Sequence, residues 1–195
     1  RSLRAVVNAP LVLTYHTKYD VDIAKAVRGK LLQESAIRAL VQNIASCDEV
    51  WVVSRGAGEN LRSLGYEGDY IVMENGVDVP RGRVSDEAIA AATGRYDLPQ
   101  NVPVFLFVGR LMWYKGIRII LDALKTLREK NVDFRMVFVG EGADGAKIRS
   151  YAEEQKLSDR CFFTGAISDR EIIRAWYGRS DLFLFPSTFD TNGLV

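Results

Sequence analysis

The sequence has little of what disulfide frameworks and most transition-metal sites require. Its 195 residues include two cysteines and one histidine, and Cys47 and Cys161 stand far apart with no C-x-x-C pattern. This usage excludes a readable disulfide framework or zinc site and favours reduced, cytosolic thiols. Long hydrophobic runs are also missing, because the apolar stretches are strand-sized and fall short of the ~20 residues of a membrane span.

A surplus of charge of one sign is absent as well. Lys and Arg number 26 against 25 Asp and Glu, which gives a formal net charge of +1. A dedicated nucleic-acid binder normally has a basic surplus, so we expect no nucleic-acid partner. The composition, with 48% hydrophobic and 26% charged residues, excludes a disordered, collagen-like or coiled-coil chain. We therefore expect an ordinary globular protein of the cytoplasm.

Apolar strand-like segments alternate with helical patterns along the chain. The expected strands are 11–15, 49–53, 70–73, 104–108, 134–139, 161–163 and 182–185. The expected helices are 23–44, a short one between Ser54 and Gly65, 86–92, 116–130, 146–156 and 169–178, the last with a capping box at Ser168. This alternation predicts an α/β fold with parallel sheets covered on both faces. Such sheets bind ligands at the carboxyl ends of their strands.

The stretch from Asn75 to Pro103 is the least regular part of the chain. It contains three of the five prolines and the basic segment Arg81–Arg83, which is typical of an interdomain connection. We therefore expect one domain over residues 1–80 and a second over residues 81–195. The first residues resemble the tail of a helix and the last residues the start of one, so we expect a fragment of a larger protein.

Two cations follow the strand expected at 104–108. Arg110 and Lys115 lie on a strand-to-helix loop beside the first N–H groups of a helix, a combination suited to a di- or polyphosphate. A second helix start at Gly193–Val195 adds further backbone donors. Both side chains are expected to project into solvent, and the alternative to a phosphate site is a pair of solvated surface cations.

Three other features carry weaker signals. Gly140–Gly145 matches G-x-G-x-x-G, but the next strand ends at Phe163–Gly165 with no acid for a ribose, which argues against a nicotinamide or flavin. Asp20-Val-Asp22 matches D-x-D, yet the positive end of a helix explains both acids, so we expect no metal. His16 follows the first expected strand, where a lone histidine is either structural or functional.

Several segments together resemble the family 4 glycosyltransferases in order and spacing. They are 14–17, 53–54, 75–78, 108–116, 139–142, 163–165 and 185–195. The resemblance implies a GT-B architecture of two Rossmann-like domains, with this chain spanning the end of the acceptor-side domain and the start of the nucleotide-sugar-binding domain. It also implies transfer of a hexose from a nucleotide-diphosphate sugar to an acceptor, with retention at the anomeric carbon and without a metal ion or other cofactor.

The resemblance also assigns roles to individual residues. Arg110 and Lys115 correspond to the pair that neutralises the donor diphosphate, and His16 to a histidine beside the reacting sugar. Asp190 stands where the family has the first of two glutamates, and the loop 163–167 corresponds to the resting place of the nucleotide base. The expected catalytic residues are His16, Arg110, Lys115 and Asp190; the expected donor-binding residues are Gly109, Arg110, Lys115, Gly140, Gly165, Ile167, Asp190, Gly193, Leu194 and Val195.

The donor base, the hexose and the acceptor stay open. The motifs look most like those of bacterial members that build glycolipids or cell-surface glycans. A peripheral contact with an anionic membrane at its inner face is suggested by the basic residues Arg1, Arg4, Arg28 and Lys30, and the alternative is a solvated helix face. Two other functions stay open beside the transferase. One is a catalytically degenerate nucleotide-sugar-binding module, suggested by Asp190 in place of glutamate, and the other is a sugar-nucleotide epimerase of the same fold.

Overall fold

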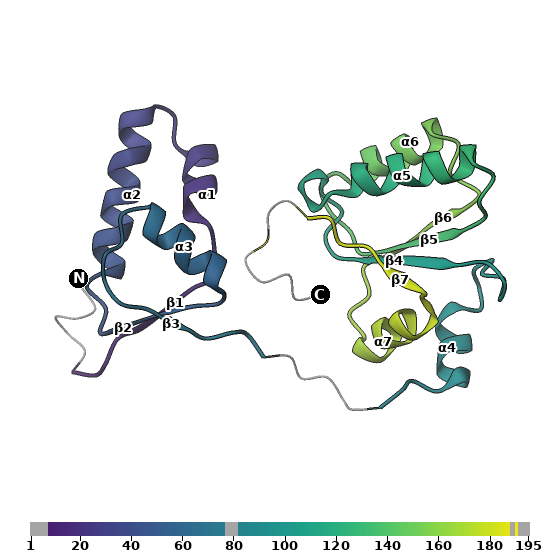
Figure 1. The fold of residues 1–195 in the computed structure, drawn as a ribbon, viewed down its shortest axis with the longest axis horizontal. Coiled ribbons are helices and arrows are strands. Elements are labelled where there is room, and N and C mark those ends of the chain that lie inside the picture. Colours follow the sequence, from purple (N-terminus) through teal and green to yellow (C-terminus); the bar gives the residue numbers. More distant parts are fainter. Residues whose placement is uncertain (1–7, 77–81, 188–189, 191–195) are drawn as a thin grey trace. The chain divides into compact units, whose positions relative to one another are not determined.

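The computed structural model describes residues 8–76, 82–187 and 190 (Figure 1). The described chain forms two compact units, one of residues 8–76 together with Asp190 and the other of residues 82–187. Each unit contains a parallel β-sheet, so the predicted α/β class is confirmed. None of the helices in the described part of the chain has the length and apolar character that crossing a bilayer requires.

The first unit has a three-stranded parallel sheet in the order β1-β2-β3. Its elements are β1 Val12–Tyr15, α1 Tyr19–Ala26, α2 Lys30–Ile44, β2 Glu49–Val52, α3 Arg55–Ser63 and β3 Ile71–Val72. The three helices lie on one side of the sheet in Figure 1. Along β2, Val50 and Val52 are buried, whereas Glu49 is exposed and Trp51 is partly exposed. Helices thus cover one face of this sheet in the described residues, where the sequence predicts two covered faces.

The single helix predicted over residues 23–44 is wrong, because two helices stand in its place. Gly29 separates α1 from α2 and has a φ of +99°. An α-helix interior does not contain such a φ, and glycine adopts it without steric cost. The Gln33 side chain donates to the Val27 carbonyl oxygen at 2.8 Å, which ties the start of α2 to the end of α1.

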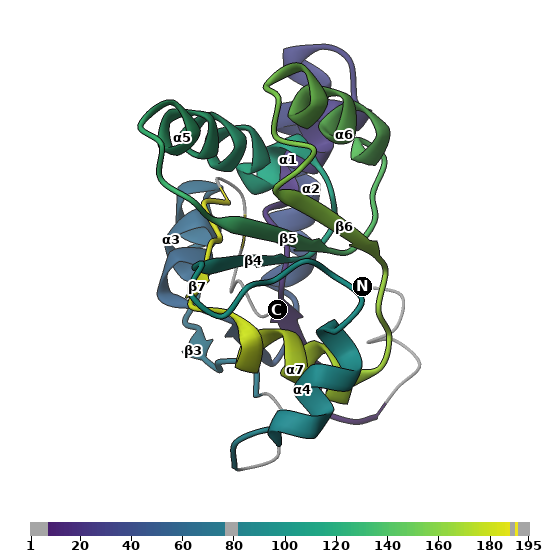
Figure 2. The same cartoon turned by 90° about the vertical axis from the view of Figure 1, so that its right-hand side faces the viewer.

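The second unit has a four-stranded parallel sheet in the order β6-β5-β4-β7. Its elements are α4 Asp86–Thr93, β4 Val104–Val108, α5 Ile117–Glu129, β5 Arg135–Val139, α6 Gly145–Glu154, β6 Cys161–Gly165, α7 Arg170–Arg179 and β7 Leu182–Phe183. Helices α5 and α6 cover one face, and α4 and α7 cover the other (Figures 1 and 2). The prediction of a sheet covered on both faces is therefore confirmed for this unit.

Two apolar layers flank the sheet of the second unit. Phe107 and Phe138 point toward α5 and α6. On the other face, Leu106 and Val137 form a layer beneath α7 together with Trp176, which α7 contributes. Neighbouring residues of β4 and β5 belong to different layers because successive side chains of a strand point to opposite faces. Each such side chain, when fully buried, contributes roughly 1.5–3 kcal/mol to stability, so β4 and β5 hold the loops at their carboxyl ends firmly in place.

The capping box predicted at Ser168 is wrong by one residue. Asp169 is the N-cap of α7, and its carboxylate accepts a hydrogen bond from the Glu171 backbone N–H at 2.8 Å. Serine and aspartate are both strong N-caps, so adjacent Ser and Asp leave the start of a helix ambiguous in sequence. Ser54 and Ser85 cap α3 and α4, since each hydroxyl oxygen accepts from a backbone N–H three residues on. The other predicted elements agree with the structure to within a few residues.

Cys161 at the start of β6 provides a test of this core. The side chain is 6% exposed, and burial raises the pKa of its thiol to about 12. Because the thiolate is the reactive form, we expect Cys161 in the folded protein to resist alkylation at about pH 8 and to react rapidly in urea. A Cys47→Ser variant isolates this thiol for mass spectrometry. Equal labelling rates with and without urea would contradict the burial of Cys161.

Candidate functional site

The strand order of the second unit creates a topological switch beside β4. The chain proceeds from β4 to β5 and β6 on one side and then places β7 on the other side of β4. The loops that follow β4 and β7 therefore lie next to each other at the carboxyl edge of the sheet, which is where open parallel sheets bind ligands. The loop after β4 contains Gly109 to Gly116, and the loop after β7 contains Phe185 and Pro186.

Arg110 and Lys115 lie in the loop after β4, and both contact Tyr114. The Arg110 guanidinium donates a hydrogen bond to the Tyr114 hydroxyl at 2.9 Å. Lys115 ends a short 3-10 turn, Trp113–Lys115, and its Nζ lies 5.4 Å from the ring centroid of Tyr114 and 5.3 Å from that of Phe185. The tyrosine therefore connects the two cations, and Phe185 brings the loop after β7 against the second one.

The expectation that both cations project into solvent is wrong for Lys115. Arg110 is exposed, but Lys115 is only 7% exposed because it packs against the two aromatic rings. The face of an aromatic ring attracts a cation by about 0.5–2 kcal/mol, which offsets part of the hydration that burial removes. A cation held in this way acts more strongly on a neighbouring anion than one surrounded by water.

Gly116 joins the loops that follow β4 and β7. Its φ is +76°, and a Cβ at this position would overlap the carbonyl oxygen of Pro186. Only glycine combines this backbone conformation with so close an approach. Helix α5 begins at the next residue, and the first N–H groups of a helix have no intrahelical acceptors. Lys115 therefore stands at the positive end of a helix dipole, as predicted for an anion site.

Three glycines lie together at the carboxyl edge of the sheet. Gly109, Gly140 and Gly165 have φ values of +147°, +136° and +82°. The Gly109 N–H donates to the Val139 carbonyl oxygen at 2.9 Å, and the Gly140 N–H donates to the Gly165 carbonyl oxygen at 2.8 Å. Ile167 follows Gly165 and packs against the apolar layer beneath α7. The structure thus brings together six predicted donor-binding residues: Gly109, Arg110, Lys115, Gly140, Gly165 and Ile167.

The remaining predicted site residues belong to the first unit or fall outside the described residues. His16 is exposed and directly follows β1, at the carboxyl edge of the sheet of the first unit. Asp190 is half-buried and groups with the first unit. Gly193, Leu194 and Val195 lie outside the described residues. The catalytic roles of His16 and Asp190 therefore stay predictions.

The D-x-D segment forms part of the first turn of α1. Asp20 accepts a hydrogen bond from the Asn60 amide at 3.3 Å, and Asn60 accepts one from the Tyr15 hydroxyl at 2.8 Å. Burial raises the pKa of Tyr15 to about 12, so its hydroxyl stays protonated and donates. Asp22 lies in the same helical turn, where the dipole favours acids. Within residues 8–76, 82–187 and 190, no three His, Cys, Asp or Glu side chains gather around a common metal position.

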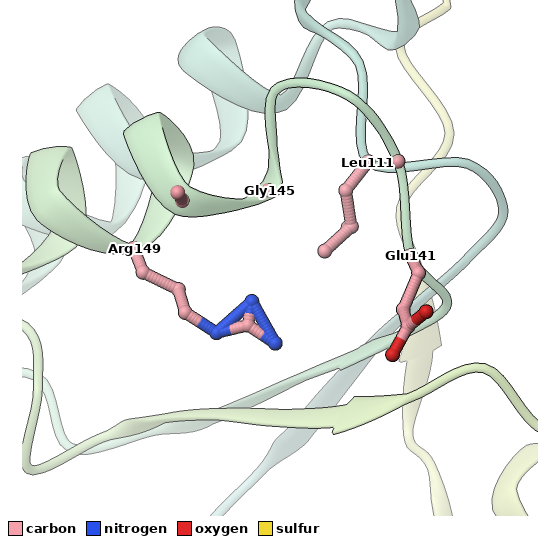
Figure 3. Close-up of a pocket in the computed structure, with 6 residues that line it drawn as sticks. Leu111, Glu141, Gly145 and Arg149 are labelled. Atoms are coloured by element: carbon pink, nitrogen blue, oxygen red, sulfur yellow. The ribbon is translucent and has the colours of Figure 1, made fainter.

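A pocket beside the three glycines was not predicted from the sequence. It has a volume of about 440 Å³ and is lined by Leu111, Glu141, Gly142, Gly145, Ala146 and Arg149. Figure 3 shows Arg149 extending from α6 and Glu141 from the loop after β5 toward the same space. A signal was present in the sequence, because Glu141 and Gly142 belong to the G-x-G-x-x-G segment and Arg149 follows one helical turn after its last glycine.

Comparison with known proteins decides the family of this chain. The family described as "Glycosyl transferases group 1" matches residues 90–195, a range that contains β4 to β7 and all the loops of the candidate site. The chain belongs to this glycosyltransferase family. The predicted resemblance to glycosyltransferases is therefore confirmed at the level of the group 1 family.

Curated relatives of this group 1 glycosyltransferase chain are about twice its length or longer. An alpha-monoglucosyldiacylglycerol synthase from Streptococcus pneumoniae is 23% identical over 190 residues, which are 95% of this chain and 43% of the relative. A 2-deoxystreptamine glucosyltransferase from Streptomyces kanamyceticus is 32% identical over 123 residues, which are 63% of this chain and 32% of the relative. The chain thus spans less than half the length of these relatives.

Solved structures confirm the predicted GT-B fold class. Sucrose-phosphate synthase from Thermosynechococcus elongatus matches with a TM-score of 0.73 and 24% identity over 99% of this chain and 48% of that protein. The HepE protein of Anabaena, solved in complex with UDP, matches with a TM-score of 0.72 and 21% identity over 92% of this chain and 47% of that protein. At these identities the likeness concerns the fold, and the GT-B class is established by it.

Proposed function

We propose that this chain is part of a retaining, family 4-like hexosyltransferase. In this proposal residues 81–195 bind the nucleotide-diphosphate sugar, and residues 1–80 belong to the acceptor-side domain. The observation that carries the proposal is the pair of positioned cations at the topological switch, Arg110 on the Tyr114 hydroxyl and Lys115 between two aromatic rings. The Anabaena neighbour was solved in complex with UDP, which supports a nucleotide diphosphate as the class of ligand.

The proposed chemistry makes the diphosphate a leaving group. The bond between the sugar carbon and the phosphate oxygen breaks, a bond from that carbon to the acceptor oxygen forms, and the proton of the acceptor hydroxyl passes to the departing diphosphate. Negative charge grows on the departing phosphate, where the forked Arg110 guanidinium and the Lys115 ammonium stabilise it. His16 is proposed to lie beside the reacting sugar, and Asp190 to accept hydrogen bonds from its hydroxyls.

The proposed acceptor is a glycolipid or a cell-surface glycan. One relative is named for the synthesis of a glucosyldiacylglycerol, which supports a lipid acceptor. At the start of α2, the cations Arg28 and Lys30 stand beside Leu31 and Leu32, whose side chains are 79% and 63% exposed. Basic side chains next to exposed apolar ones suit a peripheral contact with an anionic membrane, which we place at its cytoplasmic face.

A transfer assay with the full-length protein tests this function. We expect hexose transfer from a nucleotide sugar to a lipid or glycan acceptor, with or without EDTA, because no metal takes part in the proposed step. An Asp20→Asn/Asp22→Asn double variant should keep turnover, since asparagine retains an oxygen that accepts from Asn60. A loss in EDTA that Mn²⁺ restores would contradict metal independence. Donor binding without transfer would identify a degenerate module, and inversion of a free nucleotide sugar would identify an epimerase.

A further inference from the structure

We infer that the pocket lined by Glu141 and Arg149 receives the nucleobase of the donor and selects guanine. The inference rests on the proposed function, because it takes the diphosphate to bind at Arg110 and Lys115. It adds the identity of the base, which the shared fold and the family leave open.

The pocket adjoins the edge at which the diphosphate is proposed to bind. Leu111 follows Arg110, and its backbone N–H donates to the Glu141 carbonyl oxygen at 3.0 Å. The Glu141 carboxylate lies over the end of β6, with Oε1 3.4 Å from the position that a Cβ would take on Gly165. Neighbouring strands are about 4.8 Å apart, so a nucleotide with its phosphates beside β4 extends across β5 to this pocket. The volume of about 440 Å³ lies within the range of small-molecule sites.

Aromatic packing holds the Arg149 side chain in position. The central carbon of its guanidinium lies 4.7 Å from the ring centroid of Phe163. Phe163 in turn stacks on Phe138, with centroids 4.8 Å apart and ring planes at 10°. A guanidinium that lies over the face of a ring uses none of its N–H groups in that contact, so they stay free to donate. Arg149 therefore presents oriented donors to the pocket (Figure 3).

Glu141 and Arg149 line one pocket without neutralising each other. Neither side chain forms an ion pair with any residue in the described part of the chain, and the Arg149 contact is with the Phe163 ring. Glu141 offers hydrogen-bond acceptors to the pocket, and Arg149 offers a fork of donors. Together they fit a flat ligand that has donors along one edge and acceptors along the adjoining edge.

Among the common nucleobases, guanine has such an arrangement. Its N1–H and N2–H groups are adjacent donors that a carboxylate accepts as a pair, and its O6 and N7 atoms are adjacent acceptors that an arginine contacts bidentately. Uracil has a single N–H between two carbonyl oxygens, which a carboxylate would repel. Adenine has an acceptor at N1, where guanine has a donor. Glu141 therefore discriminates against both.

Binding of nucleoside diphosphates to the full-length protein tests the inference by calorimetry. We expect GDP to bind roughly tenfold more tightly than UDP or ADP, the discrimination of a good bidentate contact. Inosine diphosphate keeps N1–H, O6 and N7 but lacks the N2 amine. It should bind about tenfold more weakly than GDP, since one hydrogen bond to a charged acceptor is lost.

Substitution of Glu141 identifies the group responsible. Glu141→Gln places an NH₂ group opposite the N2 amine, so GDP should bind about tenfold more weakly and its advantage over inosine diphosphate should vanish. Glu153→Gln makes the same change of charge at an exposed position of α6 outside the pocket, and it should leave all affinities unchanged.

Two outcomes would overturn the inference and are distinguishable from failure of the proposed function. Equal affinities for GDP, UDP and ADP, or a GDP preference that survives Glu141→Gln, would exclude guanine selection by this pocket while leaving the diphosphate site intact. Failure of all four diphosphates to bind would remove the diphosphate site, and the proposed function would fall with it.

Discussion

Replacing Arg110 or Lys115 by alanine in the full-length enzyme is expected to lower the turnover number about 10²–10³-fold, the effect of removing one preorganised donor to a developing anion. Charge on the diphosphate rises as the bond to the sugar breaks. A positioned cation therefore stabilises the transition state more than the bound donor, and the turnover number should fall more than the apparent Michaelis constant rises. Steady-state kinetics with saturating acceptor measures both parameters.

The burial of Lys115 determines which variants are informative. Lys115→Ala leaves a gap between Tyr114 and Phe185, so lost packing would accompany lost charge. Lys115→Met retains most of the side-chain volume and should show the same loss of turnover with little change in melting temperature. Arg110→Lys should recover only part of the activity, because an ammonium cannot make a bidentate contact. Lys125→Ala, at an exposed position of α5, serves as the control. Near-normal turnover of folded Lys115→Met and Arg110→Ala would remove the main support for the diphosphate site.

Gly140→Ala is expected to lower the free energy of unfolding of the second unit by about 2–6 kcal/mol. A Cβ at this position would overlap the Gly109 carbonyl oxygen, and overpacking of this kind costs about 1–3 kcal/mol. The φ of +136° is nearly restricted to glycine and costs a further ~1–3 kcal/mol with a side chain. Urea unfolding followed by tryptophan fluorescence measures the change.

Gly82→Ala separates the two contributions to that loss. Gly82 has a φ of +117°, but no atom lies within 4 Å of the position of its Cβ. This variant should therefore show only the backbone cost of ~1–3 kcal/mol. If Gly140→Ala and Gly82→Ala lose the same stability, the contact between Gly140 and Gly109 is not as tight as the structure describes.

The sequence predicted the second unit more accurately than the first for a physical reason. Strands β4 and β5 are buried on both faces, so they appear in the sequence as continuous apolar runs. The break between α1 and α2 was not predictable from periodicity, because the apolar pattern continues from Ile23 to Ile44 across Gly29. The φ of Gly29 is a property of the backbone that the apolar pattern does not record.

The candidate site was predictable in its charges but not in its packing. Arg110 and Lys115 follow directly from their place between a strand and a helix. The burial of Lys115 depends on Phe185, a residue distant in sequence that β7 brings into contact. The pocket of Glu141 and Arg149 was not predictable from the G-x-G-x-x-G segment, because the contact that holds Arg149 over Phe163 is a tertiary one.

The position of β7 beside β4 has a consequence for how the site is acquired during folding. Asp181 accepts a hydrogen bond from the Val104 N–H at 2.8 Å, across 77 positions of the chain, whereas β4, β5 and β6 pair in sequence order. Strand pairings that close long loops form late in folding, because the chain loses the entropy of loop closure before new contacts offset that loss. Phe185 and Pro186 reach Lys115 and Gly116 only with β7. A nucleotide that contacts Lys115 therefore binds only after β7 has paired with β4. Its binding free energy then stabilises the β4–β7 pairing.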